Sequence, residues 1–293
     1  MAHLVHRRAV KVFRNQKMKE FSVLTWNTAK RLKRAPGQVE FIHKLSPDII
    51  ALQEIIPSTE QKLRSLLLKT HPHIISSFEL VKDHSKLVKK RMFGQLIASR
   101  FPLCSIDPKN FDIPWTERVL SVTASIGDLK VDLHTTHIPP GSSNGWLKVE
   151  MIDGIVQYFK GHQKNPQILC GDFNTPQKET KSDGIITFSQ RIKSDGEVAL
   201  KKRFRGGLGA DWDTSERSLF TQLNSYGLRD AYREQNPDDL DAFSWSFRRN
   251  DKEFKTRFDH MFVDKRLHLL TCEFINDQGL LSDHAPLLAK MYV

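Results

Sequence analysis

The fold of this chain is decided by the stretch Gln167-Ile168-Leu169-Cys170-Gly171-Asp172-Phe173-Asn174. Its apolar centre predicts a strand buried on both faces, with Cys170 inside it. Gly171 permits close approach of a neighbouring backbone, and the i, i+2 spacing turns Asp172 and Asn174 to the same side while Phe173 packs inward. An Asx turn would explain one Asp or Asn here, but it would not explain two of them after a buried strand.

Four more segments carry a metal ligand or a proton carrier beside a predicted strand end. The β-rich run Phe21–Trp26 precedes Asn27, and the apolar run Asp48–Gln53 precedes Glu54, so both side chains lie at strand exits. Carboxylate and amide oxygens are the ligands that Mg²⁺ prefers, and such a cation polarises a phosphoryl group. The four segments are Thr25-Trp26-Asn27, Leu52-Gln53-Glu54, Thr136-His137-Ile138 and Ser282-Asp283-His284.

The rest of the chain alternates predicted strands and helices. A hairpin around Gly127-Asp128 has Gly where a type II′ turn needs it, and this hairpin brings His137 to the rim of the fold. The segment Ser58-Thr59-Glu60-Gln61 is predicted to form a capping box after Pro57. Further strands are expected at 95–101, 119–126, 129–135, 257–263 and 286–293, and helices at 39–45, 58–70, 145–163 and 218–226.

A basic insertion is predicted at about 177–215, where the pattern breaks into Lys, Arg, Gly and Ser. It contains the run Lys201–Gly207, which could grip a phosphate-bearing substrate. A solvated loop without a role is an equally weighted alternative, because charge runs are usually exposed.

The charge balance limits the kinds of partner. The chain has 293 residues, a formal net charge of +11 and an isoelectric point near 9.5, which favours nucleic acid or an anionic membrane surface. Residues 1–19 form a basic tail without acidic residues, which fits a flexible tail, a nucleic-acid-binding arm or an organelle-targeting segment. Its basic residues are Arg7, Arg8, Lys11, Arg14, Lys17 and Lys19.

Cysteine usage and hydropathy point to an intracellular, soluble protein. Cys104, Cys170 and Cys272 are far apart and show no paired spacing, so neither a disulfide framework nor a thiolate zinc site is predicted. We see no apolar run that approaches the roughly 18 residues of a membrane-spanning helix, and no secretory leader before Phe21. We also expect the protein to be a monomer.

In this order the five segments resemble the endonuclease/exonuclease/phosphatase superfamily, from Phe21 to Val293. The resemblance implies an α/β fold, a four-layer α/β sandwich of two packed mixed β-sheets flanked by helices. It also implies cleavage of phosphodiesters or phosphomonoesters with Mg²⁺, for which Mn²⁺ could substitute. Because the motifs span almost the whole chain, one catalytic domain over residues 20–293 is expected.

The resemblance also implies roles for individual residues. Asp172 would orient or deprotonate the attacking water, and Asp259 would orient His284. The implied catalytic residues are His137, Asp172, Asn174, Asp259 and His284. The implied metal ligands are Asn27, Glu54, Asp172 and Asp283, and the implied substrate contacts are Arg118, Asn174 and Trp245.

Two further sets of side chains have competing interpretations. His134 and His137 lie three apart, and on a strand that spacing points them to opposite faces, so a shared zinc ion is not expected. His134 is then a core or supporting residue, and His260 a structural one. Large aromatic residues are either stacking platforms for bases or parts of the core; those concerned are Trp115, Trp212 and Trp245.

We therefore predict a Mg²⁺-dependent phosphodiesterase, and within that class a nuclease that hydrolyses DNA or RNA by in-line attack of water. A phospholipid or inositol-phosphate phosphoesterase of the same fold is one alternative. It is disfavoured because Arg257-Phe258-Asp259-His260 replaces the Trp-Cys-Asp-Arg type of signature of inositol phosphatases. The other alternative is an inactive nucleic-acid-binding scaffold, which the intact segments disfavour. The sequence does not indicate whether the substrate is DNA or RNA, or whether cleavage is internal or terminal.

Overall fold

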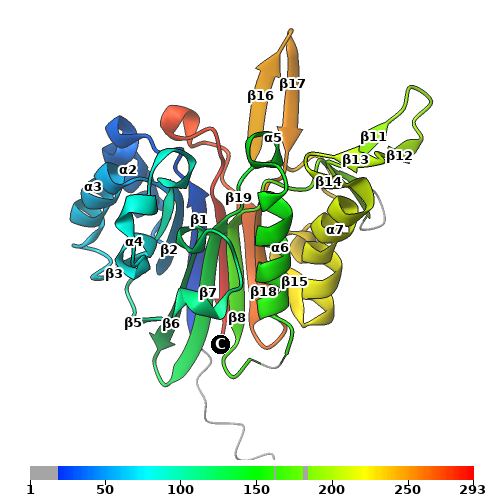
Figure 1. Ribbon diagram of the computed structural model, residues 1–293. Helices are drawn as coiled ribbons and strands as arrows, with labels where there is room; N and C mark the ends of the chain where they lie inside the picture. Colours follow the sequence, from blue (N-terminus) through cyan, green and yellow to red (C-terminus); the bar gives the residue numbers. More distant parts are fainter. Residues whose placement is uncertain (1–18, 162, 181–183) are drawn as a thin grey trace, which may run out of the picture.

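The computed structural model describes residues 19–161, 163–180 and 184–293 and contains two six-stranded sheets packed face to face (Figure 1). In the first sheet β1 pairs with β2 in parallel, whereas its other pairs are antiparallel. Its strands in spatial order are β19 (His268–Phe274), β20 (Leu287–Tyr292), β1 (Glu20–Asn27), β2 (Ile49–Ile55), β4 (Gly94–Ser99) and β3 (His73–Ser76).

The second sheet repeats this plan. Its central strands β7 and β8 are parallel, and the remaining pairs are antiparallel. Its strands in spatial order are β15 (Leu228–Asp230), β18 (Asp259–Asp264), β8 (Gln167–Asp172), β7 (Leu129–His137), β6 (Val119–Ile126) and β5 (Leu103–Ser105).

The core between the sheets is made of alternate residues of these strands. Val23 and Ile49 of the first sheet pack in one cluster with Leu133, Ile168 and Met261 of the second. The intervening residues point outward to the helices, so both faces of the central strands are buried. This explains why those strands appear in the sequence as continuous apolar runs.

Helices cover the outer face of each sheet and complete four layers (Figure 1). On the first sheet Ile42 and Leu63 of two helices pack with Leu24, and on the second Ile152 and Leu219 pack with Leu169. The predicted four-layer α/β sandwich is thereby confirmed. The covering helices are α2 (Ala35–Leu45) and α3 (Pro57–Leu67) on one side and α6 (Leu147–Tyr158) and α7 (Gly209–Ser225) on the other.

Two predictions for the first two long helices were wrong: where the first of them begins, and the capping box of the second. Helix α2 begins at Ala35 and not at Val39, because Pro36 and Gly37 lie within its first turn, where Pro is tolerated. The capping box at Ser58 is also absent from its predicted position. Pro57 is the first helical residue of α3, and the Oγ1 of Thr59 accepts a hydrogen bond from the backbone N–H of Ile56 at 2.8 Å.

The predicted insertion at 177–215 was too long at its C-terminal end. Helix α7 already begins at Gly209, and Trp212 is fully buried in the core. The residues around Trp212 are charged or small, so the first part of this helix lacks the apolar periodicity from which helices were predicted. Before it lie three short hairpins: β9 (Lys178–Thr180) with β10 (Gly184–Ile186), β11 (Gln190–Ile192) with β12 (Val198–Leu200), and β13 (Arg203–Phe204) with β14 (Gly207–Leu208).

One further hairpin projects beyond the sheets (Figure 1). It is formed by β16 (Trp245–Arg249) and β17 (Lys252–Thr256), and the sequence patterns did not predict it. The β6–β7 turn was predicted correctly, since only Gly127 of its two loop residues has a positive φ, of 64°. The remaining short helices are α4 (Ser77–Leu80), α5 (Gly141–Asn144), α8 (Ala231–Gln235), η1 (Leu32–Arg34), η2 (His84–Lys86), η3 (Lys89–Arg91), η4 (Pro108–Asn110), η5 (Thr116–Arg118) and η6 (Gly279–Leu281).

Two expectations concern the basic tail and membranes. Residues 1–18 of the predicted tail at 1–19 lie outside the described residues. The targeting or binding role of the tail therefore stays a prediction. Among the described helices, none is both long enough and apolar enough to span a bilayer.

A buried ionic cluster joins the second sheet to the first insertion hairpin. The guanidinium of Arg257 donates to Asp230 Oδ2 at 2.7 Å and to Glu179 Oε2 at 2.9 Å, and Arg257 is 2% exposed. Burial alone would raise the pKa of both carboxyl groups, but Arg257 outweighs it and holds both pKa values below their ordinary range.

We expect this cluster to make folding sensitive to acid. Carboxyl groups have pKa values near 4 in an unfolded chain, so the folded state binds fewer protons below about pH 5, and stability falls as the pH decreases. Arg257→Met should lower the free energy of unfolding at pH 7 by about 3–5 kcal/mol. Urea titrations from pH 7 to pH 3 measure both effects. Lys44→Met, which breaks an exposed ion pair, is the control; equal losses in both variants would contradict the prediction.

Candidate active site

The predicted site residues meet at one end of the two sheets. Strand β7 ends at His137 and β8 ends at Asp172, and the two residues lie opposite each other in register. Asp259, the first residue of β18, lies opposite Asp172 on its other side. Asn27 and Glu54 reach the same place from the ends of β1 and β2 in the facing sheet. Parallel central strands in both sheets therefore bring separate sequence motifs together.

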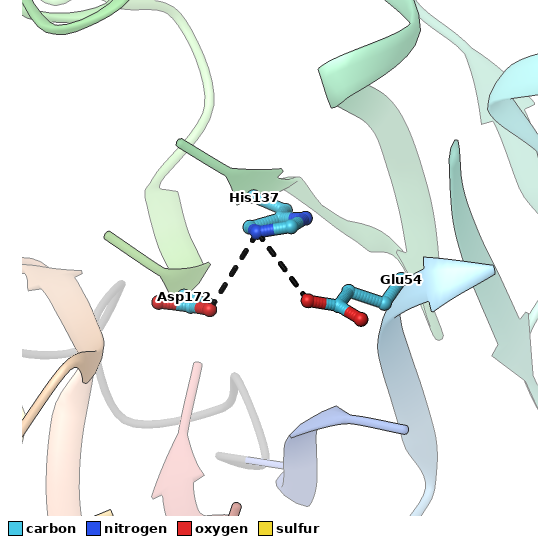
Figure 2. Close-up of side chains that lie close together, drawn as sticks. All are labelled: Glu54, His137 and Asp172. Carbon is cyan, nitrogen blue, oxygen red and sulfur yellow. Dashed lines mark ion pairs between the residues drawn. The ribbon is translucent and has the colours of Figure 1, made fainter. Parts of the chain in front are cut away.

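An irregular backbone directs Glu54 into the site. The pairing of β2 with β4 shifts between Leu52 and Ile55, and Glu54 between them has a φ of 54°. A β-bulge re-aims a side chain, and a non-glycine residue at positive φ costs roughly 1–3 kcal/mol unless the surroundings hold it. Figure 2 shows the carboxylate of Glu54 facing Asp172 and His137.

The turn after β8 depends on Gly171. Its φ is 133°, and a Cβ atom there would lie 2.0 Å from the carbonyl oxygen of Thr136. The backbone N–H of Asn174 donates to Asp172 Oδ1 at 2.9 Å, which fixes the carboxylate. Phe173 is fully buried, as its sequence position predicted.

Two carboxylates and an imidazole converge in this site. One ligand atom of each of Glu54, His137 and Asp172 lies within 4.8 Å of the other two (Figure 2). Burial, with the nearby carboxylates of Asp259 and Glu54, raises the pKa of Asp172 to about 7. A divalent cation would offset this accumulation of negative charge, so the donor set fits a metal that prefers oxygen.

The protonation of His137 makes it a hydrogen-bond donor. Arg118 Nη1 lies 2.5 Å from His137 Nδ1, and because a guanidinium only donates, Nδ1 must accept. Nε2 then carries the proton and lies 3.7 Å from both Glu54 Oε1 and Asp172 Oδ2. Burial and Arg118 lower the pKa of His137 well below its ordinary value. This tautomer leaves the two carboxylates, and not the imidazole, as metal ligands.

Asn27 lies between the two carboxylates. Its Nδ2 donates to Asp172 Oδ2 at 2.9 Å and more weakly to Glu54 Oε1 at 3.4 Å, while its Oδ1 accepts from the backbone N–H of Ala29. In this orientation Asn27 presents a donor to the site. Its predicted role as an oxygen ligand stays a prediction.

The predicted pairing of Asp259 with His284 is present. Asp259 Oδ2 lies 2.7 Å from His284 Nδ1, and His284 Nε2 lies 3.9 Å from Asp172 Oδ2. Burial alone would lower the pKa of His284, but the carboxylates of Asp259 and Asp172 outweigh it and raise the pKa to about 10. His284 is therefore a cation that points into the site.

Asp283 lies at the edge of the site, apart from the central carboxylates. Its side chain is 44% exposed and forms an ion pair with Arg31 at 3.3 Å. Trp245 Nε1 donates to Asp283 Oδ2 at 3.4 Å. The metal role of Asp283 stays a prediction.

Arg118 is a buried cation at the wall of the site. It is 2% exposed, packs 5.0 Å from the ring centroid of Phe93, and has no hydrogen-bond partner for its Nε among the described residues. Burial lowers the pKa of Arg118 to about 10. A buried guanidinium without a paired carboxylate fits an anionic ligand such as a phosphate.

The remaining predicted aromatic and histidine residues divide between core and site. Trp245 lines the site, Trp212 is in the core, and the partly buried Trp115 packs against Arg118. His134 is buried and bonded to Ser121 and Gln167, on the face opposite His137. His260 is buried and structural, as expected, with Nε2 at 2.8 Å from the carbonyl of Thr175.

Sequence reasoning missed a buried ion pair beneath the site. Lys148 Nζ donates to a carboxylate oxygen of Glu216 and, at 2.8 Å, to the carbonyl oxygen of Asn174. The other oxygen of Glu216 accepts from the backbone N–H of Phe188. Lys148 lies four residues before Ile152 on the apolar stripe of α6. A lysine at such a core position could have indicated a buried ion pair.

A pocket of about 530 Å³ is lined by Glu54, His137, Asp172 and His284, among others. Its lining combines these carboxylates with cations that include Lys30, Lys90 and Arg118. The arrangement can hold a metal ion and a phosphate side by side, which is the combination that phosphoryl hydrolysis needs.

The model of the Endonuclease/Exonuclease/phosphatase family matches residues 24–284. This chain belongs to that family. Membership confirms the resemblance inferred from the five short segments, and the match runs from the first predicted strand to His284. The site described above is thus the site of an Endonuclease/Exonuclease/phosphatase family protein.

Individual members of the family resemble this chain over most of its length. It is 26% identical over 279 residues to Exodeoxyribonuclease III of Haemophilus influenzae, covering 88% of this chain and 96% of that protein. Among solved structures, an AP endonuclease from Archaeoglobus fulgidus superposes with a TM-score of 0.63 at 17% identity, over 92% of this chain and 98% of that one. The structure of D. rerio TDP2 complexed with single strand DNA product superposes with a TM-score of 0.61 at 14% identity. This superposition covers 93% of this chain and 99% of that one. These two superpositions support the assignment of the fold.

The buried Lys148–Glu216 pair yields a stability prediction. Glu216→Gln leaves the buried ammonium without a counter-charge and should lower the free energy of unfolding by about 3–5 kcal/mol. The double variant Lys148→Met with Glu216→Leu should lose less, because it removes both charges. Chemical denaturation measures both. Glu150→Gln, on the exposed face of the same helix, is the control, and a wild-type stability for Glu216→Gln would refute the prediction.

Proposed function

We propose that this protein is a Mg²⁺-dependent nuclease that hydrolyses phosphodiester bonds of DNA. The observation that carries the proposal is the facing pair of Glu54 and Asp172 beside the cationic groups of Arg118 and His284 in one pocket. Carboxylates that gather a hard cation, next to donors that receive a phosphate, constitute a phosphodiesterase site.

The residues present fit a magnesium ion. Glu54 and Asp172 would hold it, since both offer carboxylate oxygens and the strained backbone at Glu54 serves to aim one of them. When bound, Mg²⁺ would polarise the phosphoryl group and counter the charge on the leaving oxygen. Mn²⁺ prefers similar ligands and could substitute.

The side chains of the chain itself prepare the substrate for attack. Asp172, fixed by Asn27 and Asn174, orients the attacking water. His284, held by Asp259, and the Nε2–H of His137 donate toward the phosphoryl oxygens. Arg118 supplies a fixed positive charge at the same oxygens. Donors held in place before the reaction stabilise developing charge without reorganisation.

The relatives support DNA as the substrate. Exodeoxyribonuclease III and an AP endonuclease are among the similar proteins, and the net charge of +11 suits a polyanion. A phospholipid or inositol-phosphate substrate, and an inactive scaffold, are not favoured by these relatives or by the complete site. We further propose that residues 20–293 act as one catalytic unit and that the protein is a monomer, because one chain supplies all of the site residues. Sedimentation velocity at micromolar concentration should give a single species of 33.8 kDa.

The first test is cleavage of DNA under controlled metal. The wild-type protein should nick supercoiled plasmid or degrade labelled DNA only with Mg²⁺ or Mn²⁺, and EDTA should abolish cleavage. Glu54→Gln should lower the rate by roughly a thousandfold and raise the Mg²⁺ concentration for half-maximal rate, because a metal ligand is lost.

The matched control is Glu40→Gln, an exposed carboxylate on α2. Cleavage by Glu54→Gln at the wild-type rate and with unchanged Mg²⁺ dependence would refute the site. Release of phosphate from a phospholipid or inositol-phosphate panel, without cleavage of DNA or RNA, would refute the proposal that DNA is the substrate. It would leave the proposed metal site standing.

A further inference from the structure

A second pocket, of about 750 Å³, opens directly beside the active-site pocket. It lies between the β16–β17 hairpin and the insertion hairpins that precede α7. The two pockets share five lining residues, so they adjoin each other. The shared residues are Phe188, Arg205, Trp245, Phe247 and Phe258.

A row of stacked aromatic rings runs along the hairpin side of this pocket. Phe254 stacks on Phe247 with 4.8 Å between centroids, Phe247 lies 5.0 Å from Trp245, and Trp245 stacks on Phe258 at 5.3 Å. Phe247 and Phe254 are 40% and 44% exposed. Large apolar rings exposed together on a projecting hairpin indicate an interaction surface.

The hairpin is anchored at the catalytic end of the fold. A β-bridge joins Trp245 to His284, and the backbone N–H of Ala285 donates to the carbonyl of Ser244 at 2.7 Å. The aromatic row therefore begins at the active site and leads away from it along the hairpin.

Among the charged residues that line the pocket, cations outnumber carboxylates. Lys201 Nζ lies 4.2 Å from the ring centroid of Phe204, and Arg205 lies 4.7 Å from the same ring. Lys178 and Lys255 complete the set of lysine side chains. Of the two lining carboxylates, Glu179 is already bound to Arg257, so positive charge prevails.

Exposed aromatic faces beside fixed cations have the chemistry that unpaired nucleic acid requires. Each base presents a ring face that can stack on an aromatic side chain, while the phosphates lie against Lys and Arg. In a duplex those base faces are already stacked on one another. A lipid surface or an acidic peptide would match the charge but would not need a row of aromatic rings beside the cations.

We propose that this pocket binds an unpaired nucleic-acid strand that extends from the scissile phosphate. A base of the strand stacks on Phe254, at the outer end of the aromatic row, and the phosphates face Lys201 and Arg205. This inference rests on the proposed nuclease function, because it places the strand in continuity with the active site, but binding can be measured separately from cleavage.

The binding test uses the full chain in EDTA, which prevents hydrolysis. Fluorescence anisotropy with a labelled oligothymidylate should show tighter binding than with a blunt duplex of equal length, and added salt should weaken it. Phe254→Ala should weaken oligothymidylate binding about five- to a hundredfold, and Phe254→Trp should retain it. Leu68→Ala, an exposed apolar residue on the far helix layer, is the control, and thermal unfolding verifies that each variant is folded.

The cleavage test compares a duplex with and without a single-stranded flank. The wild-type protein should cut the flanked duplex faster, and Phe254→Ala should bring the ratio of the two rates toward one. Equal affinity for strand and duplex, or unchanged strand binding by Phe254→Ala, would overturn the inference. Phe254-dependent binding to phosphatidylserine vesicles in place of the strand would also overturn it. Strand binding that depends on Phe254, without cleavage of any nucleic acid, would retain the pocket and refute the nuclease function.

Discussion

The parallel pairing of β7 with β8 is the contact on which the site depends. It sets His137 opposite Asp172 and Thr136 opposite Gly171, where a Cβ atom would lie 2.0 Å from the carbonyl of Thr136. A larger residue than glycine would force the strands apart and separate His137 from Asp172. Because β18 pairs with the other edge of β8, the same strand also places Asp259. The register of one strand thus positions much of the active site.

Concentrating charge at this end of the fold has an electrostatic cost, and the structure shows how that cost is met. Asp172 and Asp259 are both almost fully buried, and isolated buried carboxylates would be strongly unfavourable. His284 bridges them as a cation, Asn27 donates to Asp172, and Arg118 lines the same pocket. Carboxylates at this end of the fold suit a divalent cation, and the neighbouring cations suit a phosphate.

Predictions succeeded where a residue's role depends on its neighbours in the sequence. A carboxylate is costly inside a strand that is covered on both faces, so Glu54 and Asp172 were recognisable at the ends of apolar runs. The pairing of Asp259 with His284 came from resemblance to a family, and no periodicity could have given it. Helix limits were less accurate. The start of α7 at Gly209 depends on the burial of Trp212 against other elements, which local periodicity does not record.

The sequence by itself showed the alternation of strands and helices and the polar residues at strand ends, because strand burial and glycine geometry leave local patterns. Resemblance to a family implied the layered α/β fold and the roles of the site residues. Only the tertiary structure decided that Asn27 turns its amide nitrogen toward the carboxylates, that Asp283 pairs with Arg31 at the rim, and that His137 carries its proton on Nε2. These three features depend on hydrogen-bond partners that are distant in the sequence and on side-chain orientations that packing fixes. A local sequence pattern shows neither the partners nor the orientations.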